Sequence, residues 1–283
     1  MTNAPEPPSS SAPSNGITDV GGSGASPSST TPLLELRGVT KSFGPVQALK
    51  HVDLEVFDGK VTALIGDNGA GKSTLIKAIA GIYEPTDGEI LWHGQRVNIR
   101  TPRDAEHLGI ATVYQDLALC DNLDVVQNMF LGHEEVRYRM LDEISMEIAA
   151  KQTLADLSVT TVRSVRQKVA SLSGGQRQSI AVAKAVMRES KLVILDEPTA
   201  ALGVSQTAQV LQLIKTLASR GIAVLLISHN LVDVFEVADR IAVMYLGTLV
   251  SSGPVEDYDA SSAVDLITTG ASARVTASMA KTS

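Results

Sequence analysis

Short, continuous apolar runs alternate along the chain with segments whose apolar residues recur at helical spacing. Three of these runs, Val61–Ile65, Leu192–Leu195 and Ala223–Ile227, lack the regular polar alternation of a half-exposed strand. Strands of this kind are covered on both faces, as in parallel sheets. Their alternation with helices is typical of βαβ units. The pattern therefore predicts an α/β fold in which these three runs are central strands.

The two ends of the chain differ in composition from its middle. Residues 1–32 contain six of the eleven prolines and no Lys or Arg, and most of the other residues there are Ser, Thr or Gly. Such a segment buries too little apolar surface to fold, so we expect a disordered tail here and a flexible tail over residues 271–283. Residues 1–32 also lack the basic start and apolar core of a secretory signal. The folded domain is expected to span residues 33–270.

Composition narrows the classes of protein that remain. The 283 residues, 44% of them hydrophobic, are enough for one large domain or two lobes of one domain. The net charge of −7 would repel a polyanion, so a nucleic acid partner is not expected. The single cysteine, Cys120, excludes an internal disulfide and is expected to be a small buried side chain in a reducing compartment. The longest apolar runs, such as Ile222–Ile227, are far shorter than the roughly 18 residues that span a bilayer.

A glycine-rich segment follows the first predicted strand and precedes an apolar helix. It fits the phosphate-loop pattern of Gly, four residues, Gly-Lys and then Ser or Thr. Its residues are Gly66, Asp67, Asn68, Gly69, Ala70, Gly71, Lys72, Ser73 and Thr74. Backbone N–H groups of such a loop surround a polyphosphate, the helix start and the lysine add positive charge, and the Ser73 hydroxyl can ligate Mg²⁺. A purely structural turn would leave Lys72 unexplained, so the segment predicts a nucleotide site.

Polar residues also follow the other two predicted strands. Asp196 and Glu197 come after the second strand, and Ser228 and His229 after the third. Ligands collect at the carboxyl ends of parallel strands, so these side chains are expected beside the phosphate loop. Asp196 is a candidate for holding Mg²⁺ through water, and Glu197 for orienting or deprotonating an attacking water. Adjacent acids can also form a solvated turn, but the phosphate loop favours the functional interpretation. The other histidines are expected on the surface or in packing: His51, His93, His107 and His133.

A second glycine-led helix start reads Leu172-Ser173-Gly174-Gly175-Gln176. Ser173 and Gln176 have the spacing of a capping box, which satisfies free N–H groups at a helix start without any ligand. The same helix start could instead bind an anion. Local pattern alone does not decide between these two interpretations.

Five segments, taken in order, resemble the ATP-binding subunits of ABC transporters. They are Gly66–Thr74, Tyr114–Asp116, Leu172–Gln176, Leu192–Thr199 and Ser228–His229. The resemblance covers nearly all of residues 33–269, and Leu-Ser-Gly-Gly-Gln separates this family from other phosphate-loop ATPases. It implies an ABC cassette of the phosphate-loop NTPase class, with a central mainly parallel sheet and an antiparallel β portion. A helical lobe is implied as an insertion over residues 116–170.

The resemblance also implies roles for individual residues. Phe43 is similar to the aromatic residue on which adenine stacks, and Gln115 to the glutamine that contacts Mg²⁺ and the attacking water. Glu197 resembles the catalytic carboxylate, and His229 the histidine that contacts the γ-phosphate. Ser173, Gly174, Gly175 and Gln176 resemble the signature segment that contacts the nucleotide of a second subunit, which implies a head-to-tail dimer of two cassettes around ATP and Mg²⁺.

The implied partners are membrane permease subunits and an external sugar-binding protein, with the chain on the cytoplasmic face of the plasma membrane. The form Ala200-Ala201-Leu202 resembles single-cassette monosaccharide importers of the fructose, ribose or xylose type. Gly203 departs from the family pattern, which has an aspartate at this position that supports communication between the two sites. Alternatives are an importer of another solute or a soluble ABC ATPase acting on ribosomes or nucleic acid.

The family's permease contact lies after Gln115. The apolar residues there could form this contact or simply pack the helical lobe, and for each of them packing is the favoured interpretation. They are Leu123, Val125, Val126, Met129, Phe130 and Leu131.

Overall fold

The computed structural model of the chain describes Met1 and residues 31–271. The tails predicted over residues 1–32 and 271–283 lie almost wholly outside these residues. Within the described residues, no helix is both long enough and apolar enough to cross a membrane.

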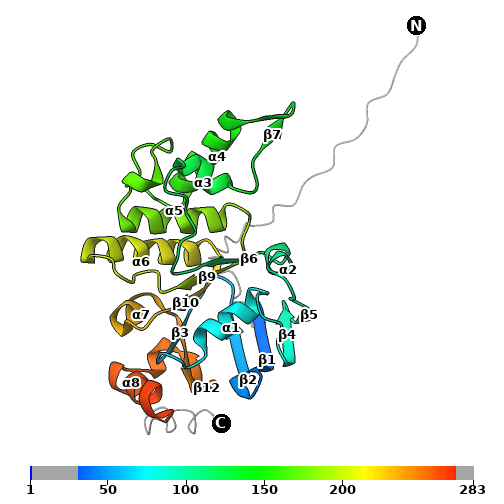
Figure 1. Cartoon of the computed structure of the whole chain (residues 1–283), viewed down its shortest axis with the longest axis vertical. Coiled ribbons are helices and arrows are strands. Elements are labelled where there is room, and N and C mark those ends of the chain that lie inside the picture. Colours follow the sequence, from blue (N-terminus) through cyan, green and yellow to red (C-terminus); the bar gives the residue numbers. More distant parts are fainter. Residues whose placement is uncertain (2–30, 272–283) are drawn as a thin grey trace.

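A six-stranded sheet forms the centre of the molecule (Figure 1). Its strand order is β12-β11-β3-β10-β9-β6, with β12 antiparallel to β11 and the other neighbours parallel. The strands are β3 (Val61–Gly66), β6 (Ile110–Val113), β9 (Leu192–Asp196), β10 (Ala223–Ile227), β11 (Arg240–Tyr245) and β12 (Thr248–Pro254). The three predicted runs are β3, β9 and β10, three neighbouring strands of this sheet. Every residue of β3 and β10 is buried, as their continuous apolar pattern predicts.

A separate four-stranded antiparallel sheet has the order β2-β1-β4-β5. Its strands are β1 (Leu34–Phe43), β2 (Val46–Val56), β4 (Asp87–Trp92) and β5 (Gln95–Val97). Figure 1 shows helix α1 (Lys72–Ile79) beside this sheet. Leu75 and Ile76 of α1 share one hydrophobic core with Leu36 of β1 and Leu64 of β3. This shared core holds the start of α1 in place at the end of β3.

Further helices lie beside the central sheet. They are α2 (Pro102–His107), α6 (Val204–Ser219), α7 (Leu231–Val237) and α8 (Ala260–Thr269), with a short 3₁₀ turn at Val255–Asp257. The helical lobe contains α3 (Val125–Phe130), α4 (Glu143–Asp156), a 3₁₀ turn at Val169–Ser171 and α5 (Gly174–Val186). A small hairpin of β7 (Val136–Arg137) and β8 (Met140–Leu141) projects from this lobe (Figure 1).

The buried residues of the helical lobe share one hydrophobic core with Leu195 of β9 and Leu226 of β10. This core decides between packing and contact for most of the apolar residues after Gln115. Val125, Val126, Met129 and Phe130 are all buried, so the packing interpretation is right for them. Leu131 is different, because it is 38% exposed.

Cys120 is half-buried, so the expectation of a fully buried side chain was wrong. Its backbone is held by the buried Asn128, whose Oδ1 accepts from the Cys120 N–H at 2.7 Å. The Asn128 side-chain amide also donates to the carbonyl of Cys120 at 3.0 Å. The buried Asn128 side chain therefore holds the backbone of this loop and leaves the Cys120 thiol half-exposed.

Candidate functional site

Four parallel strands end at one edge of the central sheet, and each is followed by a segment that the sequence singled out. Ile227 pairs with Leu64 on one side and with Asp196 on the other. Val113, the last residue of β6, pairs with Leu195. The phosphate loop, Ser228–His229, Asp196–Glu197 and Tyr114–Gln115 therefore leave the sheet side by side.

The phosphate loop is shaped by short local hydrogen bonds. The Asn68 N–H donates to Asp67 Oδ1 at 2.7 Å, and the Ala70 N–H to the Asp67 carbonyl at 3.1 Å. Gly71 has φ +104°, and a Cβ at this position would lie 2.9 Å from the carbonyl oxygen of Ala48. Glycine is required there both for the backbone conformation and for the space, so the turn delivers the chain directly into α1.

Lys72 is buried at the start of α1. Its Nζ donates to the carbonyls of Gly66 at 2.7 Å and Asp67 at 3.0 Å. Burial lowers the pKa of Lys72, and the charges of Glu197, Asp67 and Asp196 partly oppose this shift. A buried ammonium enclosed by loop backbone at a helix N-terminus is a donor set that fits a polyphosphate.

An open cleft of about 460 Å³ lies over this loop. One wall is the first part of β2, and another is the turn between β11 and β12. The sequence indicated neither of these walls. The lining residues are Val46, Gln47, Ala48, Lys50, Asp67, Asn68, Gly69, Gly71, Lys72, Ser73, Thr74, Leu246 and Gly247. The cleft therefore depends on residues far from the phosphate loop in the sequence.

Asp196 and Ser73 are the side chains that best suit Mg²⁺. Ser73 is exposed in the cleft. Asp196 is half-buried, and its pKa is raised by burial and by repulsion from Glu197, against the attraction of Lys72 and Lys77. A hydroxyl and a poorly solvated carboxylate are oxygen ligands of the kind this cation prefers. These residues fit the ion.

Glu197 and His229 face one another across the ends of β9 and β10. His229 Nδ1 lies 2.6 Å from Glu197 Oε2. The Glu197 N–H donates to the Ile227 carbonyl at 3.0 Å, and Glu197 has φ +52°, a conformation that is uncommon for a residue other than glycine. The Glu197 side chain is 17% exposed and that of His229 71%, so the carboxylate is fixed while the imidazole faces the solvent.

The second glycine-led segment starts α5. Ser173 and Gln176 make the predicted capping box, with the Ser173 N–H donating to Gln176 Oε1 at 2.9 Å. Gly175 is buried, and a Cβ there would lie 2.9 Å from Gln206 Cβ on α6. The capping interpretation is therefore right. Ser173 and Gly174 remain exposed, so this helix end is also open to a ligand.

Of two further predicted residues, Phe43 lies at the margin of the cleft and Gln115 follows β6 at the same edge of the sheet. Phe43 ends β1, is 43% exposed and packs edge to face on Tyr83 with ring centroids 5.1 Å apart. It pairs with Val46, which lines the cleft. Gln115 is exposed directly after β6. The histidines expected at the surface, His51, His93, His107 and His133, are all exposed.

Replacing Asp196 by Asn is expected to raise the melting temperature of the nucleotide-free chain at pH 7.5. The pKa of Asp196 is higher in the folded state than in the unfolded state. At pH values between these two pKa values, the folded state therefore binds more protons than the unfolded state. Ionisation of Asp196 therefore lowers the free energy of unfolding as the pH rises through that range. Thermal unfolding should show the difference between variant and wild type narrowing as the pH is lowered to about 4.

Asp58→Asn is the matched control, because Asp58 is an exposed aspartate in the turn between β2 and β3. It should leave the melting temperature nearly unchanged at both pH values. A melting temperature of Asp196→Asn at or below that of wild type at pH 7.5 would contradict the electrostatic cost assigned to this carboxylate.

The sheet topology and the loop at the end of β3 define a phosphate-loop nucleotide-binding protein. The sequence profile of the family described as ABC transporter matches residues 49–200. The chain belongs to the ABC transporter family, and as an ATP-binding cassette it binds ATP.

The chain is similar in sequence to two import ATP-binding proteins and in structure to a solved ATP-binding cassette. The chain is 46% identical over 244 residues to the fructose import ATP-binding protein FrcA of Rhizobium meliloti, covering 84% of this chain and 94% of that protein. It is 43% identical to the xylose/arabinose import ATP-binding protein XylG of Sulfolobus acidocaldarius, covering 86% and 96%. The dimeric, post-hydrolysis structure of the ATP-binding cassette MJ0796 bound to ADP and Pi superimposes with a TM-score of 0.66 at 25% identity, covering 80% of this chain and all of that one.

Proposed function

We propose that the chain is the ATP-hydrolysing subunit that energises a membrane permease importing a monosaccharide of the fructose, ribose or xylose type. The observation that carries the catalytic part is the pairing of Glu197 with His229 beside the phosphate loop. The names of the relatives FrcA and XylG support the substrate class. The chain would act at the cytoplasmic face of the plasma membrane, held there by the permease and with an external sugar-binding protein in the complex.

Each residue of the site has a definite task in hydrolysis. Lys72 and the N–H groups of the loop hold the phosphates of ATP, and Phe43 stacks on adenine. Ser73, Asp196 and Gln115 would hold Mg²⁺, which when bound neutralises charge on the β- and γ-phosphates. Glu197 orients the attacking water and accepts its proton at Oε1 or Oε2, and His229 contacts the γ-phosphate.

A second copy of the chain would complete the site. The start of α5, where Ser173 and Gly174 are exposed, belongs to the helical lobe. The phosphate loop instead opens at α1 beside the four-stranded sheet (Figure 1). The signature segment of one chain would then contact the nucleotide held by its partner. Closure of such a dimer excludes water from both sites, which couples hydrolysis to opening and closing.

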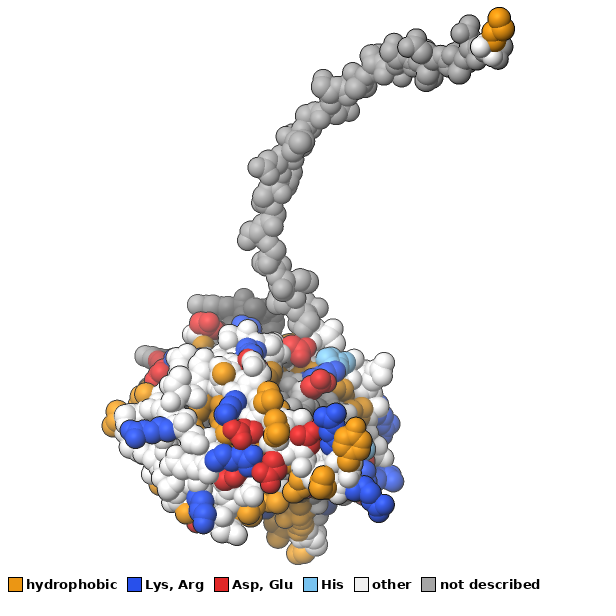
Figure 2. Space-filling model, turned by 90° about the horizontal axis from the view of Figure 1, so that it is seen from above, with side chains coloured by type: hydrophobic (Ala, Val, Ile, Leu, Met, Phe, Trp, Pro, Cys, Tyr) orange, Lys and Arg blue, Asp and Glu red, His pale blue; other side chains and the backbone are white. Residues whose placement is uncertain are grey.

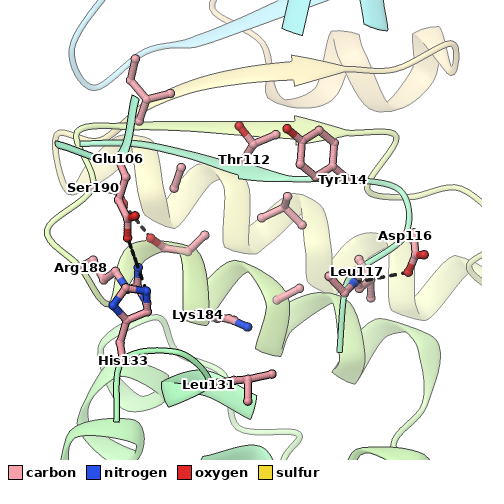
Figure 3. Close-up of a pocket in the computed structure, with 16 residues that line it drawn as sticks. Glu106, Thr112, Tyr114, Asp116, Leu117, Leu131, His133, Lys184, Arg188 and Ser190 are labelled. Atoms are coloured by element: carbon pink, nitrogen blue, oxygen red, sulfur yellow. Dashed lines mark hydrogen bonds and ion pairs between the residues drawn. The ribbon is translucent and has the colours of Figure 1, made fainter. Parts of the chain in front are cut away.

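A cleft beside the helical lobe is the surface that we assign to the permease. It has a volume of about 320 Å³ and lies between the edge strand β6 and α5 (Figure 3). Tyr114 and Asp116 lie on one side of it and Leu131 and Lys184 on another, while Glu106 pairs with Arg188 at one end. Within the described residues Lys184 makes no ion pair, and it is half-buried. The cleft adjoins Gln115, so a helix of the permease seated there would lie next to the nucleotide site.

The helical lobe also has a group of exposed large apolar side chains. They lie on the β7–β8 hairpin and on the outer face of α4: Val136, Tyr138, Met140, Leu141, Ile144 and Ile148. Grouped exposed hydrophobic residues mark interaction surfaces. On the face seen in Figure 2, acidic and basic side chains are interspersed with hydrophobic ones, which favours a protein partner over a polyanion.

Isolation of the tagged Glu197→Gln chain with ATP from its native membranes tests the proposed function. Identification by mass spectrometry should find a polytopic permease, with or without a sugar-binding protein. Recovery of ribosomal or nucleic acid-associated proteins without a permease would replace the proposal by the soluble ABC ATPase.

Leu131→Asp is expected to remove the permease from that preparation. The variant replaces an apolar side chain that lines the cleft by a charged one, which would have to be buried against the partner. ATP affinity should stay within about twofold of wild type, because Leu131 lies outside the cleft over the phosphate loop. Thr268→Asp, an exposed position on α8, is the control and should retain the permease. Retention by Leu131→Asp would exclude this cleft as the permease surface.

A further inference from the structure

We propose that Asp233 is a positioning residue for ATP hydrolysis, because its carboxylate holds the turn that carries Glu197 through a hydrogen bond to Thr199. This proposal rests on the role of Glu197 in the proposed function. Asp233 lies on α7, in the segment that follows β10, and Thr199 lies two residues after Glu197 in the segment that follows β9. The bond therefore joins two segments that leave neighbouring strands.

The contact is short, and it joins a buried carboxylate to the half-buried side chain of Thr199. The Thr199 hydroxyl donates to Asp233 Oδ2 at 2.7 Å, and Asp233 is only 5% exposed. A buried carboxylate is costly unless hydrogen bonds satisfy it, so this geometry is strongly favoured over a free threonine side chain.

Glu197 needs support from outside its own turn. Its φ of +52° and the φ of +58° at Ala201 place two residues other than glycine in the left-handed region within one short turn. Inside the turn, the Ala200 N–H donates to the Glu197 carbonyl at 3.1 Å and the Leu202 N–H to the Thr199 carbonyl at 3.3 Å. Such conformations persist only where the surroundings fix them.

Three contacts supply that support, one from the last residue of β10 and two from the segment after it. The backbone of Glu197 bonds to the carbonyl of Ile227, its carboxylate lies against His229, and Thr199 bonds to Asp233. The first two act on Glu197 directly, but His229 is mostly exposed and must also be free to meet the γ-phosphate. The part-buried Thr199–Asp233 bond is the side-chain contact that remains when His229 turns to the nucleotide.

Loss of this bond should affect the rate of hydrolysis more than the binding of ATP. The phosphate loop and Lys72 are fixed by their own contacts to β3 and to the shared core, none of which involves Thr199 or Asp233. The carboxylate of Glu197, in contrast, would lose the constraint that sets its distance from the attacking water. Misplacement of a catalytic group by about 1 Å can cost on the order of a hundredfold in rate.

The test compares Thr199→Val, Thr199→Ser, Asp233→Ala and the Thr199→Val/Asp233→Ala double variant in the full chain. Steady-state ATP hydrolysis gives kcat and KM, and equilibrium titration gives the ATP affinity. We expect Thr199→Val and Asp233→Ala each to lower kcat at least about tenfold with ATP affinity within about threefold of wild type. Thr199→Ser keeps the hydroxyl and should restore kcat to within about twofold. The double variant should be no slower than either single one, because both remove the same interaction.

Tyr258→Phe is the matched control. It removes a different side-chain hydrogen bond, the buried one between Ser251 of the edge strand β12 and Tyr258 at 2.8 Å. It should lower the melting temperature without lowering kcat. If Thr199→Val behaves in the same way, the bond is only structural and the proposal is overturned.

The remaining outcomes are equally decisive. A double variant that multiplies the two single effects would show that Asp233 does not act through Thr199, and this also overturns the proposal. If Asp233→Ala does not fold, the contrast between Thr199→Val and Thr199→Ser decides alone. Glu197→Gln is measured in the same experiment. If this variant still hydrolyses ATP, the role of Glu197 itself is overturned. If it does not hydrolyse ATP but the Thr199 variants have the wild-type kcat, only the role of Asp233 is overturned.

Discussion

Replacing Glu197 by Gln is expected to lower ATP hydrolysis by at least about a hundredfold while leaving ATP bound. A positioned acid–base group contributes about 10² to 10⁴ to a rate, and glutamine keeps the size of the side chain without its ability to accept a proton. The 2.6 Å contact with His229 can be kept by the amide, so the surrounding geometry should survive. Steady-state hydrolysis and equilibrium binding of ATP, measured on the same preparation, test the two parts of this prediction.

The chain provides a closely matched control for this variant. Glu189 also has a positive φ, +55°, but it precedes β9 and so lies at the opposite end of the strand from Glu197. Glu189→Gln removes the same charge from the same backbone conformation and should leave hydrolysis within about twofold of wild type. Steady-state turnover by Glu197→Gln close to that of Glu189→Gln would exclude Glu197 as the catalytic carboxylate.

Replacing Lys72 by Ala should weaken the binding of ATP about tenfold to a hundredfold. Hydrogen bonds to charged groups contribute about 1.5 to 3 kcal/mol, and this ammonium is held in the phosphate loop by two backbone carbonyls. Burial lowers the pKa of Lys72, so desolvation of its charge offsets what its two hydrogen bonds contribute to the stability of the nucleotide-free chain. The variant is therefore expected to bind ATP poorly without losing thermal stability in the nucleotide-free state.

Titration with ATP and thermal unfolding without ATP separate these two effects. Lys151→Ala serves as the control, because Lys151 is exposed on α4 and pairs only with Glu147 at 2.6 Å in the described chain. It should change neither quantity appreciably. An ATP affinity of Lys72→Ala equal to that of wild type would contradict the assignment of the phosphate loop. A large drop in melting temperature would show that Lys72 is mainly structural.

The sequence predicted the elements of the site well because their signals are local. The continuous apolar runs identified β3, β9 and β10, and the spacing of Ser173 and Gln176 identified the capping box that starts α5. In the phosphate loop, the glycines are required by the local backbone conformation and the lysine supplies positive charge. Neither depends on distant parts of the chain. Placement of the polar segments side by side then followed from a general property of parallel sheets.

The sequence could not predict which residues come together from distant parts of the chain. It gave no indication that Val46 and Gly247 line the cleft, or that Thr199 bonds to Asp233. It also left Val125 and Leu131 equivalent, although the first is in the core and the second borders a cleft. Cys120 was expected to be buried because of its residue type, yet the loop around Asn128 leaves it half-exposed.

The sequence by itself therefore determined the α/β class, the central strands, the phosphate loop and the start of α5. These features depend on periodicity, on backbone conformation and on hydrogen bonds between residues a few positions apart. Only the tertiary structure decided the order of the strands, the walls of the cleft, the contact of Glu197 with His229 and the hydrogen bond of Thr199 to Asp233. These depend on strand register and on which side chains the packing of separate elements buries, and neither is fixed by neighbours in the sequence.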